Sequence, residues 1–172
     1  QVIASADVPV VLKDVKQELV DTGLEKAREV TQGQLAALVS KEKITQEDAD
    51  KRLDEVMGLI TGTTTYEGFG DVDFVIEAVP EKMEIKKAVY RELDEVTPGH
   101  AILASNTSYL NVDEIAASTS RPQDVVGLHF FSPANIMKLL EVVRGAKTAP
   151  DVLLTAMQLA KKIKKAAVVA SV

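Results

Sequence analysis

The sequence predicts an α/β fold, with a doubly wound and mostly parallel sheet and helices on both faces. Short runs of β-branched and apolar residues alternate along the chain with longer segments of helical periodicity. Strands separated by helices pair in parallel, because the helix returns the chain to the end of the sheet where the previous strand began. No internal repeat or low-complexity linker interrupts the pattern, so we expect a single domain over residues 1–172.

The composition is that of a globular chain and excludes several functional classes. Of the 172 residues, 46% are hydrophobic and 27% are charged, and the formal net charge is −6. A nucleic-acid binder needs a basic surface and is therefore not expected. The absence of cysteine excludes disulfides, thiolate zinc ligands and a cysteine nucleophile. No apolar run is long enough for a transmembrane helix, and the two histidines stand in no metal-ligand spacing, so we expect neither a membrane span nor a metal site.

Seven apolar runs have the length and the β-branched content of strands. The first, VPVVLKDV, and the third, VDFVIEAV, are rich in valine, and Pro80 ends the third. The predicted strands cover residues 8–15, 59–65, 72–79, 101–104, 125–131, 139–143 and 166–172.

Helical periodicity fills most of the intervals between these strands. Thr45 and Asp48 form a capping-box pattern at the start of the second helix, and Thr148 is a candidate cap for the last, where Pro150 suits the first turn. The predicted helices cover residues 16–43, 45–57, 82–96, 112–117 and 150–165. Their expected inward residues are Leu19, Ala27, Val30, Leu35 and Leu38 in the first helix, Leu53 and Val56 in the second, and Ile85, Val89 and Leu93 in the third.

In an open α/β sheet, ligands bind beyond the carboxyl ends of the strands, so polar residues at those ends are candidate site residues. These residues are Asp14, Glu77, Glu81, Ser105, Asn106, Thr107, Ser108 and His129. An acidic residue at the position of Asp14 can accept hydrogen bonds from a ribose, and its charge favours NAD over NADP. An ordinary turn aspartate is the alternative.

The glycine-rich turn that normally accompanies such an aspartate does not occur in the sequence. The nearest string, Gly68-Phe69-Gly70, precedes a predicted strand instead of following one, so it cannot hold a pyrophosphate at a helix N-terminus. Counting back about 20 residues from Asp14 places the glycines before Gln1. We therefore expect the chain to begin inside the first helix of the domain, and a glycine-free upstream sequence would refute this.

His129 and Glu141 form the second candidate constellation. His129 lies in GLHFFSP, and Glu141 follows twelve residues later within the predicted buried strand KLLEVV. A buried carboxylate needs a partner, and a histidine at the neighbouring strand end would supply one. A carboxylate that orients an imidazole and raises its basicity suits a general base near neutral pH. A packed core histidine is the alternative.

Four strings of the sequence resemble the NAD-binding domain of 3-hydroxyacyl-CoA dehydrogenases, most closely the dehydrogenase part of multifunctional fatty-acid oxidation proteins. The strings are VVLKDV, VDFVIEAVPE, ILASNTSYL and GLHFFSPANIMKLLEVV. The resemblance covers essentially the whole chain. It implies a Rossmann-like domain, NAD as cofactor, and oxidation of (S)-3-hydroxyacyl-CoA to 3-ketoacyl-CoA in fatty-acid β-oxidation.

The resemblance also implies roles for individual residues. His129 matches the catalytic base, Glu141 the glutamate that orients it, and Ser108 a serine that binds the substrate oxygen beside the nicotinamide. Ser132 stands where many relatives have asparagine, and its shorter side chain puts that contact in doubt. The implied cofactor-binding residues are Asp14, Ala78, Glu81, Lys86, Asn106, Ser108 and Ser132.

Members of the family begin with a strand and a glycine-rich turn and continue into a helical domain that closes over the acyl chain. The resemblance therefore implies a partial domain, truncated at both ends and inactive alone. The implied partners are an acyl-CoA substrate, the helical domain of the same polypeptide and, for the full-length protein, further copies of itself. A bacterial cytoplasmic location is expected, with mitochondrial and peroxisomal relatives as alternatives.

Three other interpretations remain open. A stand-alone 3-hydroxybutyryl-CoA dehydrogenase would use the same chemistry and differ in its flanking sequence. A non-catalytic relative would use the fold for binding or structure, but the joint presence of His129, Glu141 and Ser108 disfavours it. Another hydroxyacid dehydrogenase would not be expected to carry the HFF string.

Overall fold

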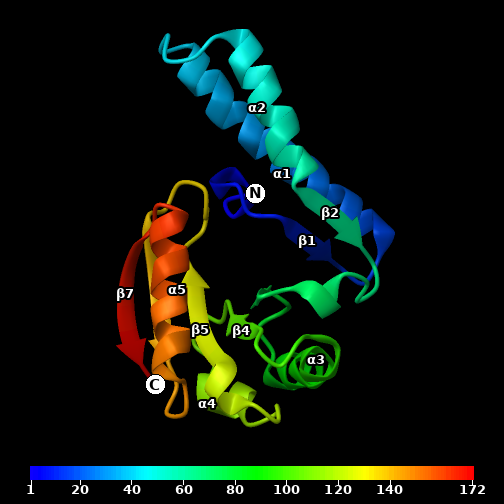
Figure 1. The fold of residues 1–172 in the computed structure, drawn as a ribbon, viewed down its shortest axis with the longest axis vertical. Helices are drawn as coiled ribbons and strands as arrows, with labels where there is room; N and C mark the ends of the chain where they lie inside the picture. The colour runs from blue at the N-terminus through cyan, green and yellow to red at the C-terminus, as the bar shows by residue number, and fades with distance from the viewer. The chain divides into compact units, whose positions relative to one another are not determined.

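The computed structural model describes all 172 residues, which form two compact units, residues 1–67 and 68–172. In the first unit a two-stranded parallel sheet pairs Val10 with Ile60, and two helices lie side by side as a hairpin (Figure 1). A single turn of 3-10 helix, Ala4–Ala6, precedes the sheet. The elements of this unit are β1 (Val10–Lys13), α1 (Gln17–Val39), α2 (Gln46–Gly58) and β2 (Ile60–Thr63).

The second unit contains a five-stranded sheet in the order β3-β4-β5-β6-β7. All neighbouring strands pair in parallel except β5 and β6, which are antiparallel. Helix α5 packs on β5, β6 and β7, whereas α4 packs on β5 and on α3 (Figure 1). The elements are β3 (Phe74–Glu77), α3 (Met83–Val96), β4 (Ile102–Ser105), α4 (Val112–Ala116), β5 (Val125–Phe130), β6 (Leu139–Arg144), α5 (Pro150–Lys162) and β7 (Ala166–Ser171).

The predicted α/β class and its mostly parallel strands are confirmed. All seven predicted strands are present: five are shorter than the apolar runs by one to four residues, β4 is equally long but shifted by one residue, and β6 is one residue longer. The core of the second unit lies on β4, which is buried along its whole length, and on the first four residues of β5. These central strands carry uninterrupted small and branched side chains because both of their faces are covered.

Two of the predicted helix faces are only partly correct, because Ala27 of α1 and Leu93 of α3 are buried as predicted but other predicted residues are exposed. In α1, Leu19 is 46% exposed, and the buried residues are Val20, Ala27 and Thr31. The face turns because Val20 packs on Gly62 of β2, where a Cβ would come within 2.4 Å of the valine methyl carbon. The other misplaced residues of α1 and α3, Leu38 and Ile85, are each 37% exposed.

One predicted helix cap is confirmed and one is wrong. Thr45 Oγ1 accepts a hydrogen bond from the amide of Asp48, and the Asp48 carboxylate accepts one from the amide of Thr45. Thr148 caps nothing, because Ala149 is the N-cap residue of α5. The Thr148 hydroxyl instead donates to the carbonyl of Val125 at 2.7 Å and accepts from the amide of Gly145 at 3.0 Å. It joins β5 to the loop before α5.

Gly127 allows β5 and β6 to approach each other closely. It pairs with Val143 across the antiparallel ladder. A Cβ at position 127 would lie 2.6 Å from the Cβ of Val143 and 3.1 Å from a methyl carbon of Val112. Neither neighbour has a flexible end that could swing away, so this position excludes larger residues.

We expect Gly127→Ala to lower the free energy of unfolding by about 1–3 kcal/mol, because the added methyl overpacks the β5–β6 contact. Urea denaturation followed by circular dichroism measures the effect. Gly99→Ala is the matched control, because a Cβ at Gly99 has no neighbour within 4 Å. Equal midpoints for the two variants would contradict the expectation.

Candidate active site

The register of β5 and β6 places His129 opposite Glu141. Residues directly opposite on antiparallel strands share a face of the sheet, so the two side chains meet. His129 Nδ1 lies 2.8 Å from Glu141 Oε2, with the side chains 17% and 39% exposed. When Nδ1–H donates to this carboxylate, the lone pair of the imidazole is on Nε2. The arrangement presents Nε2 as a base.

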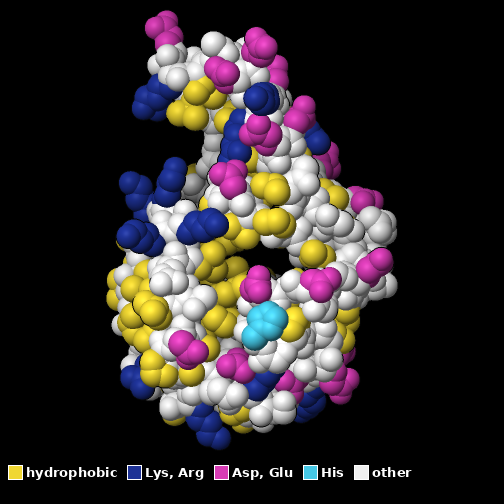
Figure 2. Space-filling view, viewed as in Figure 1, with side chains coloured by type: hydrophobic (Ala, Val, Ile, Leu, Met, Phe, Trp, Pro, Cys, Tyr) yellow, Lys and Arg dark blue, Asp and Glu magenta, His cyan; other side chains and the backbone are white.

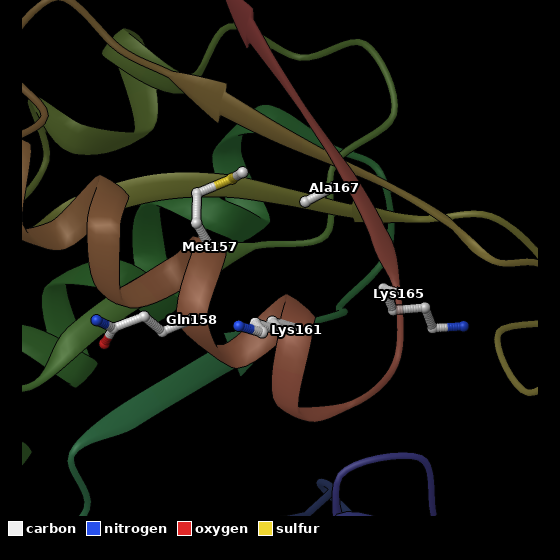
Figure 3. Close-up of a pocket in the computed structure, with 5 residues that line it drawn as sticks. All are labelled: Met157, Gln158, Lys161, Lys165 and Ala167. Atoms are coloured by element: carbon white, nitrogen blue, oxygen red, sulfur yellow. The ribbon is translucent and has the colours of Figure 1, made fainter.

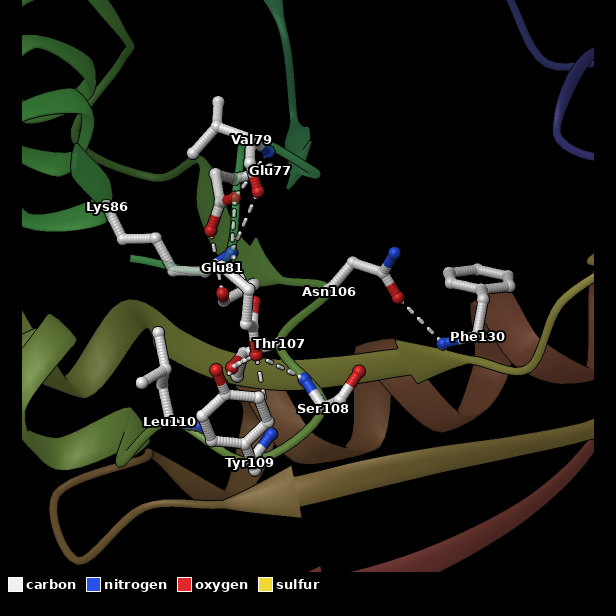
Figure 4. A network of polar contacts seen from close by, with 11 residues as sticks. Glu77, Val79, Glu81, Lys86, Asn106, Thr107, Ser108, Tyr109, Leu110 and Phe130 are labelled. Atoms are coloured by element: carbon white, nitrogen blue, oxygen red, sulfur yellow. Dashed lines mark hydrogen bonds and ion pairs between the residues drawn. The ribbon is translucent and has the colours of Figure 1, made fainter. Parts of the chain in front are cut away.

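The backbone next to His129 is tied to the loop that follows β4. The amide of Phe130 donates to Asn106 Oδ1 at 2.8 Å (Figure 4). On the other side, the ring of Phe131 lies against the imidazole, with 4.6 Å between the ring centroids. His129 is therefore held in place by the Glu141 carboxylate, by the ring of Phe131 and by the hydrogen bond that the neighbouring Phe130 amide donates to Asn106.

Glu81 organises the same loop from the other end. Its Oε1 accepts hydrogen bonds from Thr107 Oγ1 at 2.5 Å, from the amide of Ser108 at 2.8 Å and from the amide of Tyr109 at 3.4 Å (Figure 4). Burial alone would raise the pKa of Glu81. The hydrogen bonds from Thr107 and Ser108, together with the Lys86 ammonium, outweigh burial and lower that pKa below its ordinary value.

A fully buried ion pair lies behind Glu81. Lys86 Nζ is 2.7 Å from Glu77 Oε1 and 3.2 Å from Glu81 Oε2, and the side chains of Lys86 and Glu77 are 0% and 1% exposed. Glu77 also accepts from the Ser105 hydroxyl and from the amide of Val79, each at 2.7 Å. These five residues lie at the ends of β3 and β4, in the loop that follows β3, and in α3.

Tyr90 packs one turn after Lys86 on the buried face of α3. Burial, and then the nearby Glu77 carboxylate, raise the pKa of Tyr90 well above its ordinary value. The phenol is therefore neutral beside the ion pair and adds no charge to it.

The structure brings most of the sequence-predicted residues of the second unit into one network. Glu81, Lys86 and Ser108 are linked by the contacts above, and Asn106 joins them because its amide donates to the carbonyl of Glu77. His129 adjoins Asn106 through the amide of Phe130. Ala78 and Ser132 are exposed residues in the loops after β3 and β5, and no contact joins them to this network.

Asp14 lies in the first unit, at the carboxyl end of β1. Its amide donates to the carbonyl of Thr63 at 3.2 Å, and its Oδ1 accepts from the amide of Val15 at 2.7 Å. The Asp14 carboxylate is partly exposed, which leaves Oδ2 for a ligand. The string Gly68-Phe69-Gly70 leads into a short 3-10 helix, Phe69–Asp71, with Gly68 at φ 84°. It precedes β3 and therefore does not form the turn between a strand and a following helix that holds a pyrophosphate.

The sequence signalled Glu77, Ser105 and Thr107 as strand-end residues but gave them no role. The structure shows that they carry the contacts which hold the loop. A glutamate at the end of an apolar strand, nine residues before a lysine, was the available signal for Glu77 and Lys86. That signal does not by itself distinguish a buried pair from two solvated side chains.

A pocket of about 350 Å³ lies between α5 and β7 (Figure 3). It contains none of the predicted site residues, because its lining is Met157, Gln158, Lys161, Lys165 and Ala167. Leu154, Val168 and Val169 of the same two elements are 45–58% exposed. Figure 2 shows hydrophobic side chains gathered over this part of the molecule. No helix is both long and apolar enough to cross a membrane.

The whole chain, residues 1–172, matches the family described as "3-hydroxyacyl-CoA dehydrogenase, NAD binding domain". It is 40% identical over 164 residues to a peroxisomal fatty acid beta-oxidation multifunctional protein of Arabidopsis thaliana, covering 95% of this chain and 22% of the relative. It is 37% identical to the fatty acid oxidation complex subunit alpha of a Psychrobacter species, covering 96% of this chain and 22% of the relative.

Among solved structures, 3-hydroxybutyryl-CoA dehydrogenase of Escherichia coli is similar with a TM-score of 0.85 and 34% identity. The match covers 99% of this chain and 34% of that structure. The chain thus spans about a fifth of the length of the two curated relatives.

The lowered pKa of Glu81 predicts an acid-sensitive contribution to stability. A carboxylate whose folded pKa is depressed stabilises the fold above its unfolded pKa, ordinarily about 4.3, and that stabilisation is lost as pH falls through the folded value. We expect Glu81→Gln to flatten the dependence of unfolding free energy on pH below about pH 4.5. Urea titrations between pH 7 and pH 3 measure this, with the exposed Glu84→Gln as control. Parallel acid limbs for wild type and Glu81→Gln would contradict it.

Proposed function

The chain belongs to the family of 3-hydroxyacyl-CoA dehydrogenase NAD-binding domains, and from this premise we propose that a longer polypeptide containing it oxidises (S)-3-hydroxyacyl-CoA to 3-ketoacyl-CoA. The observation that carries the proposal is the His129–Glu141 pair, 2.8 Å apart at the carboxyl end of β5. The reaction needs a base for the 3-hydroxyl proton, and Nε2 of His129 is available for that task.

The proposed chemistry uses the imidazole in both directions. When bound, NAD accepts the hydride that leaves C3 of the substrate. His129 Nε2 takes the hydroxyl proton as the carbonyl forms, and the Glu141 carboxylate stabilises the imidazolium that results. In the reverse reaction the protonated imidazole returns its proton to the carbonyl oxygen of the 3-ketoacyl group. A positioned base of this kind contributes about 10²- to 10⁴-fold to the rate.

Ser108 is proposed to bind the same substrate oxygen. Its side chain is exposed, while its amide is fixed by Glu81. A hydroxyl donor beside the oxygen stabilises the negative charge that develops there as the proton leaves. His129 and Ser108 together would define where the 3-hydroxyl group sits.

The residues present fit the polar groups of NAD. Ala78, Ser108 and Ser132 are exposed in loops at the carboxyl ends of β3, β4 and β5, where open sheets bind ligands. Their hydroxyl and backbone groups suit the carboxamide and ribose hydroxyls of the nicotinamide half. Further proposed contacts are the half-buried Glu81, the amide of Asn106 and, in the first unit, the Asp14 carboxylate toward a ribose. Lys86, which is buried, would contribute through Glu81.

We further propose that these 172 residues are part of a dinucleotide-binding domain and turn over negligibly by themselves. The support is that they contain no glycine-rich phosphate cradle and that the curated relatives are more than four times as long. The additional residues of such a polypeptide would supply the phosphate contacts, a helical domain over the acyl chain and the contacts between copies.

We expect His129→Gln to lower kcat by about 10²-fold or more, because it removes the base, and to change the Kd for NADH by less than about threefold. The assay is acetoacetyl-CoA-dependent NADH oxidation by the longer polypeptide. His100→Gln is the control, since His100 is 68% exposed and contacts only Asp73. An unchanged kcat in His129→Gln would remove His129 from the mechanism, and no turnover in a folded, NADH-binding wild type would favour a non-catalytic relative.

We expect Glu141→Gln to lower kcat and to move the pH profile of hydroxyacyl-CoA oxidation. Without the carboxylate the imidazole loses the partner that orients it and balances its charge, so the rising limb of kcat/KM against pH should move. Steady-state rates between pH 5 and pH 10 measure the shift. A lower rate with an unmoved limb would mean that Glu141 acts only on structure.

A further inference from the structure

A chain of buried polar contacts runs from α3 to Ser108, and the proposed chemistry uses only its far end. It begins at Glu77 and Lys86, which are shielded from solvent, continues to Glu81, and ends on the Thr107 hydroxyl and the Ser108 amide (Figure 4). The Lys86 ammonium and the Glu77 carboxylate are thereby placed where apolar side chains would be expected, whereas Glu81 is partly exposed.

Stability alone does not account for this arrangement. Removing an ammonium and a carboxylate from water carries a large desolvation penalty, and well-packed apolar residues in place of a buried ion pair are often as stable or more stable. The ion pair instead fixes the orientation of its side chains, because each carboxylate oxygen and each ammonium proton has a defined partner. The buried chain is therefore better explained by what it holds in place.

The chain holds the two loops that follow β3 and β4. Glu77 accepts from the Ser105 side chain and from the amide of Val79, and its carbonyl accepts from the amide of Asn106 at 2.8 Å. Residues 106–111 form no helix or strand. Their conformation therefore depends on side-chain contacts, of which Glu81 makes the largest share.

Ser108 depends most on these contacts. The side chain of Ser108 is exposed, and the residue is held by the hydrogen bond that its backbone amide donates to Glu81. Thr107, immediately before it, is 4% exposed and is bonded both to Glu81 and to the amide of Leu110, at 3.0 Å. A movement of Glu81 would therefore displace the Ser108 hydroxyl.

Resting on the proposed function, we propose that Glu77, Lys86 and Thr107 are positioning residues, which act through Glu81 to hold the Ser108 hydroxyl where it meets the substrate oxygen. A displacement of about 1 Å at a reacting group can lower a rate by about 10²-fold. The effect should appear in kcat, because the oxygen needs Ser108 most as its charge develops.

Thr107→Val tests the outer end of the chain with almost no change in side-chain shape. The matched control is Thr148→Val, because the Thr148 hydroxyl is equally buried, also donates to one oxygen and also accepts from one amide. We expect Thr107→Val to lower kcat about tenfold with the KM for NADH nearly unchanged. Thr148→Val should lose comparable stability while keeping its kcat, and Thr107→Ser should restore most of the lost rate.

A double-mutant cycle with Ser108→Ala tests whether Thr107 acts through Ser108. If it does, Thr107→Val should lower kcat little further once the Ser108 hydroxyl is gone. Ser105→Ala removes one donor to Glu77 at the inner end of the chain and should also be non-additive with Ser108→Ala. Ser118→Ala, which removes a hydroxyl bonded to the carbonyl of Ile115, is its control.

These measurements, made on the longer polypeptide, separate two kinds of failure. Equal kcat for Thr107→Val and Thr148→Val, or fully additive losses with Ser108→Ala, would overturn the positioning role and leave the proposed function intact. An unchanged kcat in Ser108→Ala would overturn the role of Ser108 and with it the positioning role, whereas no acetoacetyl-CoA-dependent NADH oxidation by wild type would overturn the proposed function itself.

Discussion

The Lys86 ammonium has no contact with solvent, and this constraint fixes much of the second unit around it. A charge in such surroundings must be matched by opposite charge within hydrogen-bond reach. Glu77 and Glu81 meet that need, from the end of β3 and from the loop after it. Helix α3 and the carboxyl edge of the sheet therefore cannot slide past one another without separating the ions. The position of the Ser108 loop depends on the same ion pair, because Glu81 also accepts the hydrogen bonds that hold this loop.

The histidine pair is positioned by a different physical means. His129 and Glu141 face each other because of the backbone register of two strands. Gly127, where an added Cβ would lie 2.6 Å from that of Val143, is two residues away along the same ladder. The backbone pairing of β5 and β6 positions His129 and Glu141, whereas hydrogen bonds from side chains position Ser108. The two parts are joined by the pairing of β4 with β5 and by the hydrogen bond from the amide of Phe130 to Asn106.

The sequence was sufficient where local pattern decides the structure. It predicted the strands, the Thr45 capping box and, from a charge inside an apolar strand, the pairing of Glu141 with His129. It misplaced part of the buried face of α3, because hydrophobicity placed Ile85 inward and gave no sign that the Glu77 and Glu81 carboxylates would allow Lys86 to be buried. It assigned Thr148 to a cap, whereas its partner on β5 is far along the chain. The contacts of Asp14, Ala78 and Ser132 with a cofactor stay predictions.

The antiparallel turn from β5 to β6 also bears on the order in which the site assembles during folding. His129 and Glu141 are 12 residues apart, and their strands form a hairpin-like pair without any crossover. The Glu77–Ser105 and Glu81–Thr107 contacts span 28 and 26 residues and require a helical crossover between parallel strands. Closing a longer loop costs more chain entropy before any contact compensates for it, so contacts between residues far apart in the sequence form more slowly. The acid–base pair is thus a local structure that can form early, and the serine loop is a late one.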